Sequence, residues 1–285
     1  MRKFQQTYSD ATFTMGINHL ADRRIQELVS GTKSSLKSYP VSSKQSVEVK
    51  DFPESLDWRV KGVISPVHSQ GLVGEIIAAI VSTELVETLK AIEAKNFIEG
   101  SISRVYDCCP QSIDVFECIR NMSGICKNSD YPTALKKCEP NQCKPFFTFD
   151  KINKLANNDE TTMLAWIQES TLWAEVDAEK FAMYMGGIYD EPACSQTSID
   201  HVLQIVGYGV EGGNPYWICK NSWGEDWGEK GYIRIARGKN MCAIATQVVQ
   251  VANTKTSDAR RSQTIIPMFF ILMLTIVVQR ISNYY

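Results

Sequence analysis

The sequence predicts an α+β protein of two lobes, one helical and one built from antiparallel strands, with a cleft between them. In the first half, apolar residues recur over a long stretch with the spacing of an amphipathic helix. The second half holds short runs of β-branched and aromatic residues bounded by glycines, a pattern typical of antiparallel strands. A helical part followed by a strand-rich part indicates an α+β fold. The 285 residues suffice for one large or two modest packed units.

Composition and charge narrow the class of function. A net charge of −2 supplies no basic surface, so we expect no nucleic-acid partner. Nine cysteines indicate disulfide bonds and an oxidising compartment. Because only Cys108 and Cys109 lie close together, the spacing fits no zinc site, and we predict neither a metal nor another cofactor. Asn121 begins the one Asn-X-Ser/Thr sequon and is a predicted glycosylation site, consistent with secretion.

Residues 1–50 predict no folded domain of their own. Residues 1–10 are polar and lack the apolar run of a signal peptide, so we expect a truncated start or a lost signal. Residues 13–29 indicate a short exposed hairpin and helix, and the Ser/Lys/Gly-rich residues 30–50 indicate a linker. Large apolar groups return at Phe52, and we place the folded domain at residues 51–252.

The predicted helices belong to the first half of this domain. A long helix is expected from Gly74 to about Lys95, with glutamates and lysines between its apolar residues. Turn signals bracket a second helix from about Ser112 to Met122. The predicted antiparallel strands follow, at Leu172–Asp177, Leu203–Tyr208, Tyr216–Cys219 and Tyr232–Ile235.

A polar spacer at residues 253–263 precedes a hydrophobic C-terminal segment at residues 264–281. The segment is short for a span of roughly 20 residues, but no further chain follows to cover it. We therefore predict a membrane anchor rather than a core helix, and not a removed lipid-anchor signal, because polar residues 279–285 follow. The cysteines place the domain on the extracellular or lumenal side, although Arg260 and Arg261 favour the cytosol.

Three separated motifs carry the functional prediction. A glycine turn at residues 70–74 (QGLVG) runs directly into the long helix, Asp200-His201 opens a predicted strand, and residues 216–232 read YWICKNSWGEDWGEKGY. Over residues 13–251 the chain resembles papain-like cysteine proteases, whose fold has a helical left lobe and a barrel-like right lobe. Residues 18–22 resemble the end of the family's inhibitory propeptide, so residues 1–50 are interpreted as a propeptide remnant plus linker.

The resemblance assigns roles to individual positions. It places the histidine at His201, the asparagine that orients it at Asn221, and the oxyanion-hole glutamine at Gln70, with Trp223 as a supporting residue. The nucleophilic cysteine falls on Ile76, which has no heteroatom, so the resemblance implies an inactive protein. Glu75 and Ser82 are the nearest alternative nucleophiles, but one points round the helix and the other lies deeper.

Further departures from the family pattern indicate which relatives the chain resembles and how it binds. The lost cysteine and the apolar C-terminus make the chain look most like inactivated paralogues of the group 1 proteases of mites. The glycine-rich segment that pairs with substrate backbone in the family is replaced after Asp107-Cys108, so we expect ordinary peptide binding to be lost.

The resemblance also implies two disulfides, Cys194–Cys242 and Cys108–Cys138. Val73 has lost the thiol of a third family bridge. Three complete pairings remain open for four further cysteines, and Cys219 is expected to be a packed free thiol. The four are Cys109, Cys118, Cys126 and Cys143.

Three hypotheses follow. The first is an inactive protein that acts by binding protease inhibitors, peptides or host proteins, as a decoy or an interference factor. The second is residual or altered cysteine-type peptidase activity through a displaced nucleophile. The third is a membrane-tethered structural protein.

Overall fold

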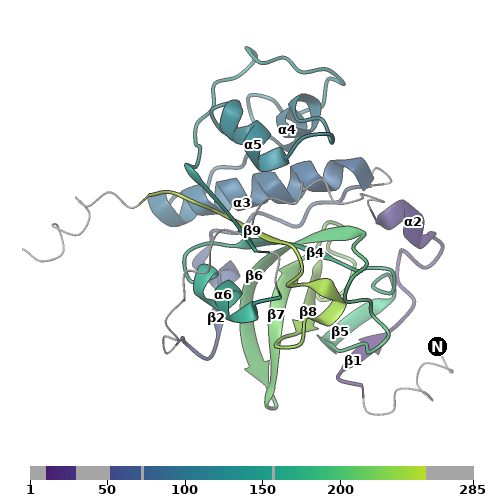
Figure 1. Cartoon of the computed structure of the whole chain (residues 1–285). Coiled ribbons are helices and arrows are strands. Elements are labelled where there is room, and N and C mark those ends of the chain that lie inside the picture. The colour runs from purple at the N-terminus through teal and green to yellow at the C-terminus, as the bar shows by residue number, and fades with distance from the viewer. Residues whose placement is uncertain (1–10, 30–51, 72–73, 156–157, 255–285) are drawn as a thin grey trace, which may run out of the picture. The chain divides into compact units, whose positions relative to one another are not determined.

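The computed structural model of the chain describes residues 11–29, 52–71, 74–155 and 158–254 (Figure 1). The predicted linker at residues 30–50 and the hydrophobic segment at residues 264–281 therefore lie outside the described residues. Within the described ranges no helix is both long and apolar enough to cross a membrane.

A helical lobe is built around α3 (Ile77–Ala94), which the short 3₁₀ turn η2 (Gly74–Ile76) precedes. α4 (Ile102–Cys108) and α5 (Val115–Asn121) pack on one side of α3, and the sheet lies on the other (Figure 1). Lys95 ends α3 in the left-handed conformation, with φ 52°. Because α3 lies between two layers, it is buried on nearly all sides, and the buried residues include Glu84, Glu87 and Lys90.

The second lobe is a sheet with the strand order β1-β5-β8-β7-β6-β4-β9-β3, and β2 pairs with β6. The four predicted strands are present as β4, β6, β7 and β8 and pair antiparallel with one another, but β5 pairs in parallel with β8, so the lobe is not purely antiparallel. The strands are β1 (Phe13–Met15), β2 (Leu56–Asp57), β3 (Lys151–Leu155), β4 (Leu172–Val176), β5 (Tyr184–Tyr189), β6 (His201–Glu211), β7 (Asn214–Lys220), β8 (Tyr232–Ala236) and β9 (Val248–Ala252). The remaining helical elements are α2 (Ile25–Leu28), η1 (Arg59–Lys61), α6 (Glu160–Trp166) and η3 (Met241–Ala243).

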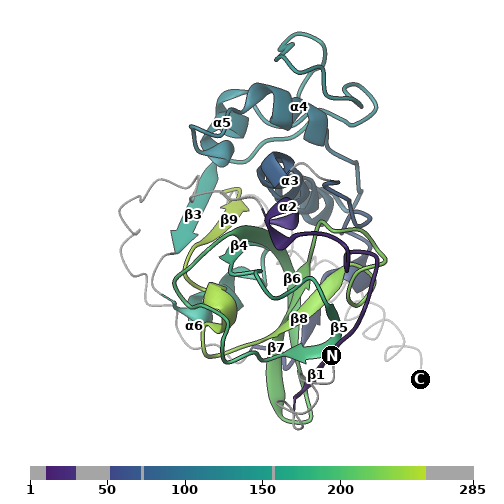
Figure 2. The ribbon, with the colours of Figure 1, turned by 90° about the vertical axis from the view of Figure 1, so that its right-hand side faces the viewer.

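The N-terminal segment, residues 11–29, is part of the packed domain. We expected an exposed hairpin and helix, which was wrong: β1 pairs with β5, and Phe13 and Leu28 are buried. β5 offers an open edge for pairing and the ring of Tyr189, whose centroid lies 4.6 Å from that of Phe13. α2 is a single turn that lies beside the N-terminal end of α3 in both views (Figures 1 and 2).

Four disulfides connect the chain. Cys108–Cys138 and Cys194–Cys242 are the pairs that the resemblance implied. The pairing left open by the sequence is Cys109–Cys118 and Cys126–Cys143. Cys219 is a buried free cysteine, and burial raises the pKa of its thiol. Disulfides of this number fit an extracellular or lumenal location.

Candidate active site

His201 and Asn221 meet because β6 and β7 are neighbours in the sheet. His201 is the first residue of β6, and Asn221 follows the last residue of β7. The Nε2 atom of His201 lies 2.7 Å from Oδ1 of Asn221, which also accepts the backbone N–H of Ser222. Since the amide oxygen only accepts, Nε2 carries the proton and Nδ1 is the basic nitrogen of the ring.

His201 is held as a neutral imidazole. Its side chain is 1% exposed, and Nδ1 has no hydrogen-bond partner. Burial lowers the pKa of His201 to about 4, although the hydrogen bond to Asn221 acts in the opposite direction. The ring of Trp223 covers the pair, with centroids 5.0 Å apart. An imidazole in this state accepts a proton at Nδ1 only below neutral pH.

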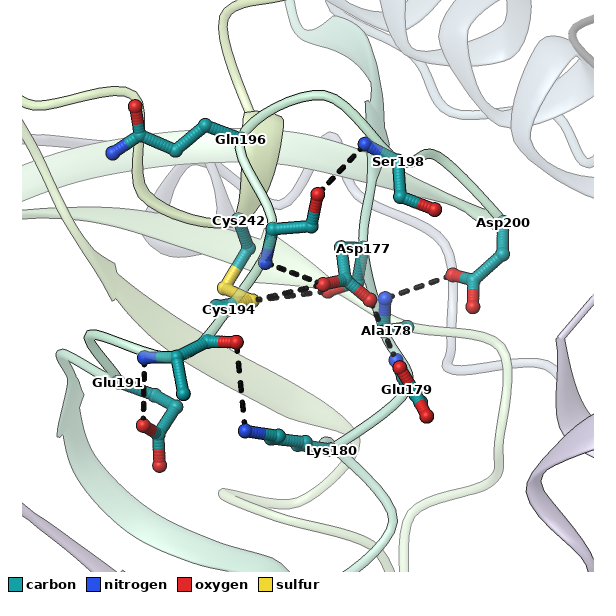
Figure 3. The surroundings of a disulfide bond; sticks show 12 residues. Asp177, Ala178, Glu179, Lys180, Glu191, Cys194, Gln196, Ser198, Asp200 and Cys242 are labelled. Atoms are coloured by element: carbon teal, nitrogen blue, oxygen red, sulfur yellow. Dashed lines mark hydrogen bonds between the residues drawn. A yellow bond between two sulfur atoms is a disulfide. The ribbon is translucent and has the colours of Figure 1, made fainter.

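The disulfide Cys194–Cys242 lies next to the turn that leads into the histidine strand (Figure 3). Asp177, just after β4, accepts the backbone N–H of Ser195 at 2.6 Å and donates its own backbone N–H to Cys242. Asp200 accepts the backbone N–H of Ala178 at 2.8 Å, and burial raises the pKa of Asp200 to about 6. The bond between Asp200 and Ala178 therefore holds the residue immediately before His201 against the end of β4.

Ile76, to which the resemblance assigns the nucleophile position, is the last residue of η2 and lies at the N-terminal end of α3. Its side chain is half-buried and packs against the core of the helical lobe. The alternatives from the sequence do not replace it. Ser82 is fully buried and donates to the carbonyl of Ala79, whereas Glu75 is exposed and has no partner among the described residues.

The resemblance assigns Gln70 the role of an oxyanion-hole donor, which stays a prediction, and in the structure its amide group already has hydrogen-bond partners. Its Nε2 donates to the backbone carbonyl of Leu28 at 2.7 Å, and its Oε1 accepts the hydroxyl of Ser222. The indole N–H of Trp223 donates to the same carbonyl at 3.1 Å. The N-terminal segment therefore places a peptide carbonyl against the site, a feature that the sequence pattern did not indicate.

A buried charge cluster behind the site was also missed. Lys220 donates to Glu84 at 2.7 Å and to Ser65 at 2.9 Å, and Nδ1 of His68 lies 2.9 Å from the same Glu84 oxygen. Burial raises the pKa of Glu84, but Lys220 and His68 outweigh it and leave the pKa lowered. Burial raises the pKa of the neighbouring Glu87 to about 7.

Two other predicted features are placed as follows. Asn121 is exposed at the C-terminal end of α5, and glycosylation there stays a prediction. Within the described ranges no group of three His, Cys, Asp or Glu side chains is arranged to hold a metal ion.

Comparison with known proteins gives consistent matches over most of the chain. The family model described as papain family cysteine protease matches residues 52–252. Cathepsin 7 of Mus musculus is 32% identical over 263 residues, covering 84% of this chain and 78% of that protein. P34 probable thiol protease of Glycine max is 37% identical over 203 residues, covering 65% of this chain and 53% of that protein.

Among solved structures, a recombinant stem bromelain precursor superposes with a TM-score of 0.78 at 28% identity. The superposition covers 89% of this chain and 87% of the other. The likeness to mite proteases in particular is not addressed by these matches and stays a prediction.

Proposed function

This chain belongs to the papain family of cysteine proteases, and we propose that it is a member without peptidase activity that acts by binding. The observation that carries the proposal is Ile76 at the nucleophile position, together with a His201 whose Nδ1 has no partner. Cysteine proteases of this type need a thiolate that histidine activates. An aliphatic side chain offers no lone pair, so the retained histidine and asparagine have nothing to activate.

The expected loss of activity is large. Removing the nucleophile of a catalytic triad lowers turnover by a factor on the order of 10⁶. Ser82 does not support the alternative of a displaced nucleophile, since it is buried within α3.

The N-terminal segment restricts how a partner reaches the cleft. The carbonyl of Leu28 already accepts from Gln70 and Trp223, and Nε2 of His19 lies 3.3 Å from the carbonyl of Trp223. A protease inhibitor, peptide or host protein that enters the cleft therefore displaces this segment. We therefore propose that the chain acts as a decoy or an interference factor only after its N-terminal segment has left the cleft.

The test is a peptidase assay with a matched revertant. A cleavage site for a specific protease, introduced within residues 30–51, allows the N-terminal segment to be released after folding. The released protein and its Ile76→Cys, Ile77→Trp variant are assayed with fluorogenic peptides of varied sequence. We expect turnover only in the variant; turnover by the unaltered chain would overturn the proposal.

We also propose that the domain lies on the extracellular or lumenal side of a membrane and is anchored through residues 264–281. The four disulfides support an extracellular or lumenal location of the domain. The anchor rests on the apolar sequence alone. Expression of the whole chain with and without residues 264–281, followed by separation of membranes, tests it: the anchor predicts that only the whole chain stays with the membranes after a high-salt wash.

A further inference from the structure

A cavity of about 580 Å³ opens in the helical lobe beside Ile76. Among the residues that the structure describes, those that line the cavity fall between residues 70 and 136, in η2, α3, α4, α5 and the loops around them, and none belongs to the strand-rich lobe. Its apolar wall is formed by Ile76, Ala78, Ala79, Val105, Ile113 and Val115. The cavity therefore lies in the helical lobe at the candidate active site itself, because Gln70 and Ile76 both line it.

The departures from the family sequence explain why there is open space here. The glycine-rich segment expected after Cys108 is absent, and Cys109 instead bonds to Cys118, nine residues further along the chain. The floor is well packed, with Val105 and Val115 buried, whereas Ile113 at the rim is 41% exposed. A packed apolar floor below an exposed apolar rim is a preformed binding surface.

The size and surroundings of the cavity favour a small molecule over a polypeptide. Pockets of about 300–1,000 Å³ with mostly apolar walls are typical of small-molecule sites. None of the lining residues lies in a strand, so an extended peptide would find no open sheet edge for backbone pairing.

The charges at the cavity favour a cation. Glu75, Asp107 and Lys136 all line it, which leaves one net negative charge. The carboxylate of Asp107 is engaged by the hydroxyl of Tyr131 and by the backbone N–H groups of Leu135 and Lys136. Glu75 is exposed and has no partner among the described residues, so its carboxylate is free for a ligand.

We propose that this cavity binds a small amphipathic molecule, with an apolar body against Ile113 and Val115 and a protonated amine near Glu75. The inference rests on the proposed function in one respect, because it treats the protein as a binder. Its test is a binding measurement that does not depend on peptidase activity, so the two proposals fail separately.

Two fluorescent probes of opposite charge form the test on the whole chain. Dansylcadaverine carries a protonated amine, and dansyl-6-aminocaproic acid carries a carboxylate on a body of the same kind. We expect saturable binding of the amine, with weaker binding of the acid. Equal binding of both probes, or no saturable binding of the amine, would overturn the proposal.

Substitutions at the charged rim locate the amine. Because both side chains are exposed, we expect Glu75→Gln to weaken amine binding by about two- to fivefold and Lys136→Gln to strengthen it by a similar factor. For the acid probe, the two substitutions should act in the opposite directions. Unchanged affinities in both variants would contradict the placement of the amine.

A substitution in the wall locates the apolar body. Ala78 is half-buried and lines the cavity, so Ala78→Phe should reduce binding by about tenfold or more. Ala94→Phe is the matched control, since Ala94 is exposed at the other end of the same helix. Equal loss in both variants would contradict the site; thermal unfolding of both verifies that they are folded.

Discussion

His201 should stay neutral in the folded protein until the pH falls to about 4. Burial causes the low pKa, against 6.5 for an unperturbed histidine, and each pKa unit corresponds to about 1.4 kcal/mol. Charging His201 in the fold therefore costs about 3 kcal/mol more than charging it in the unfolded chain. As the pH falls below about 6.5, the unfolded chain takes up the proton first, so this contribution to stability is complete above pH 6.5 and is lost as the pH falls towards 4.

Other buried groups titrate in the same range with the opposite sign. Burial raises the pKa of Asp200 to about 6 and that of Glu87 to about 7, so both groups favour the folded state as the pH falls. The pH dependence of the total free energy of unfolding therefore does not give the contribution of His201 alone. The difference between the wild type and His201→Gln does, because glutamine retains a donor for Asn221.

Two assays measure the effect. The chain has three histidines, so nitrogen NMR of the imidazoles, with His201→Gln for assignment, gives the pKa of His201 directly. Urea unfolding between pH 4 and 7.5 should show that the wild type loses about 3 kcal/mol more than His201→Gln on acidification. A His201 pKa at or above 6.5, or equal pH dependence in the two proteins, would show that burial does not hold His201 neutral.

Three further predictions concern the contacts around the site. Gln70→Ala removes the amide that donates to the carbonyl of Leu28, so residues 11–29 should exchange backbone hydrogen about five- to a hundredfold faster, and unchanged exchange would show that the contact does not hold the segment. Lys220→Met leaves the buried Glu84 with only His68 as a cationic partner and should reduce the free energy of unfolding by about 3–5 kcal/mol in urea, with recovery when Glu84→Leu is added; failure of the double variant to recover would contradict the role of the ion pair. Replacing both cysteines of Cys109–Cys118 with serine should reduce stability by about 2–3 kcal/mol and weaken binding of dansylcadaverine, and intact binding would show that the cavity does not depend on this loop.

The sequence predicted those features that depend on local pattern or on a long motif. α3 was predicted because its apolar residues recur at helical spacing, and the neighbouring strands that hold His201 and Asn221 were predicted from their composition and from the resemblance. The helix nevertheless differs from a surface helix. Glu84 can be buried because it pairs with Lys220. Lys220 lies 136 residues away in the sequence, so no local pattern reveals the pair.

The N-terminal segment shows the same limit. Three residues of β1 are too few for a strand signal, and they form a strand only because β5 offers an edge more than 160 residues later. The contact of this segment with the site is made by the backbone carbonyl of Leu28, which any residue type could supply, so the sequence could not predict it. The pairing of Cys109 with Cys118 depends likewise on how the loop after α4 folds, so three arrangements stayed open until the structure selected one.

We propose that the chain has no peptidase activity because residue 76 carries no thiol. The most direct measurement compares kcat/KM of the unaltered chain with that of His201→Ala, both after release of the N-terminal segment, and includes the Ile76→Cys, Ile77→Trp variant as the positive reference. We predict that the first two are indistinguishable from buffer while the variant turns over peptide. Turnover by the unaltered chain that His201→Ala abolishes would show that the chain is an active peptidase.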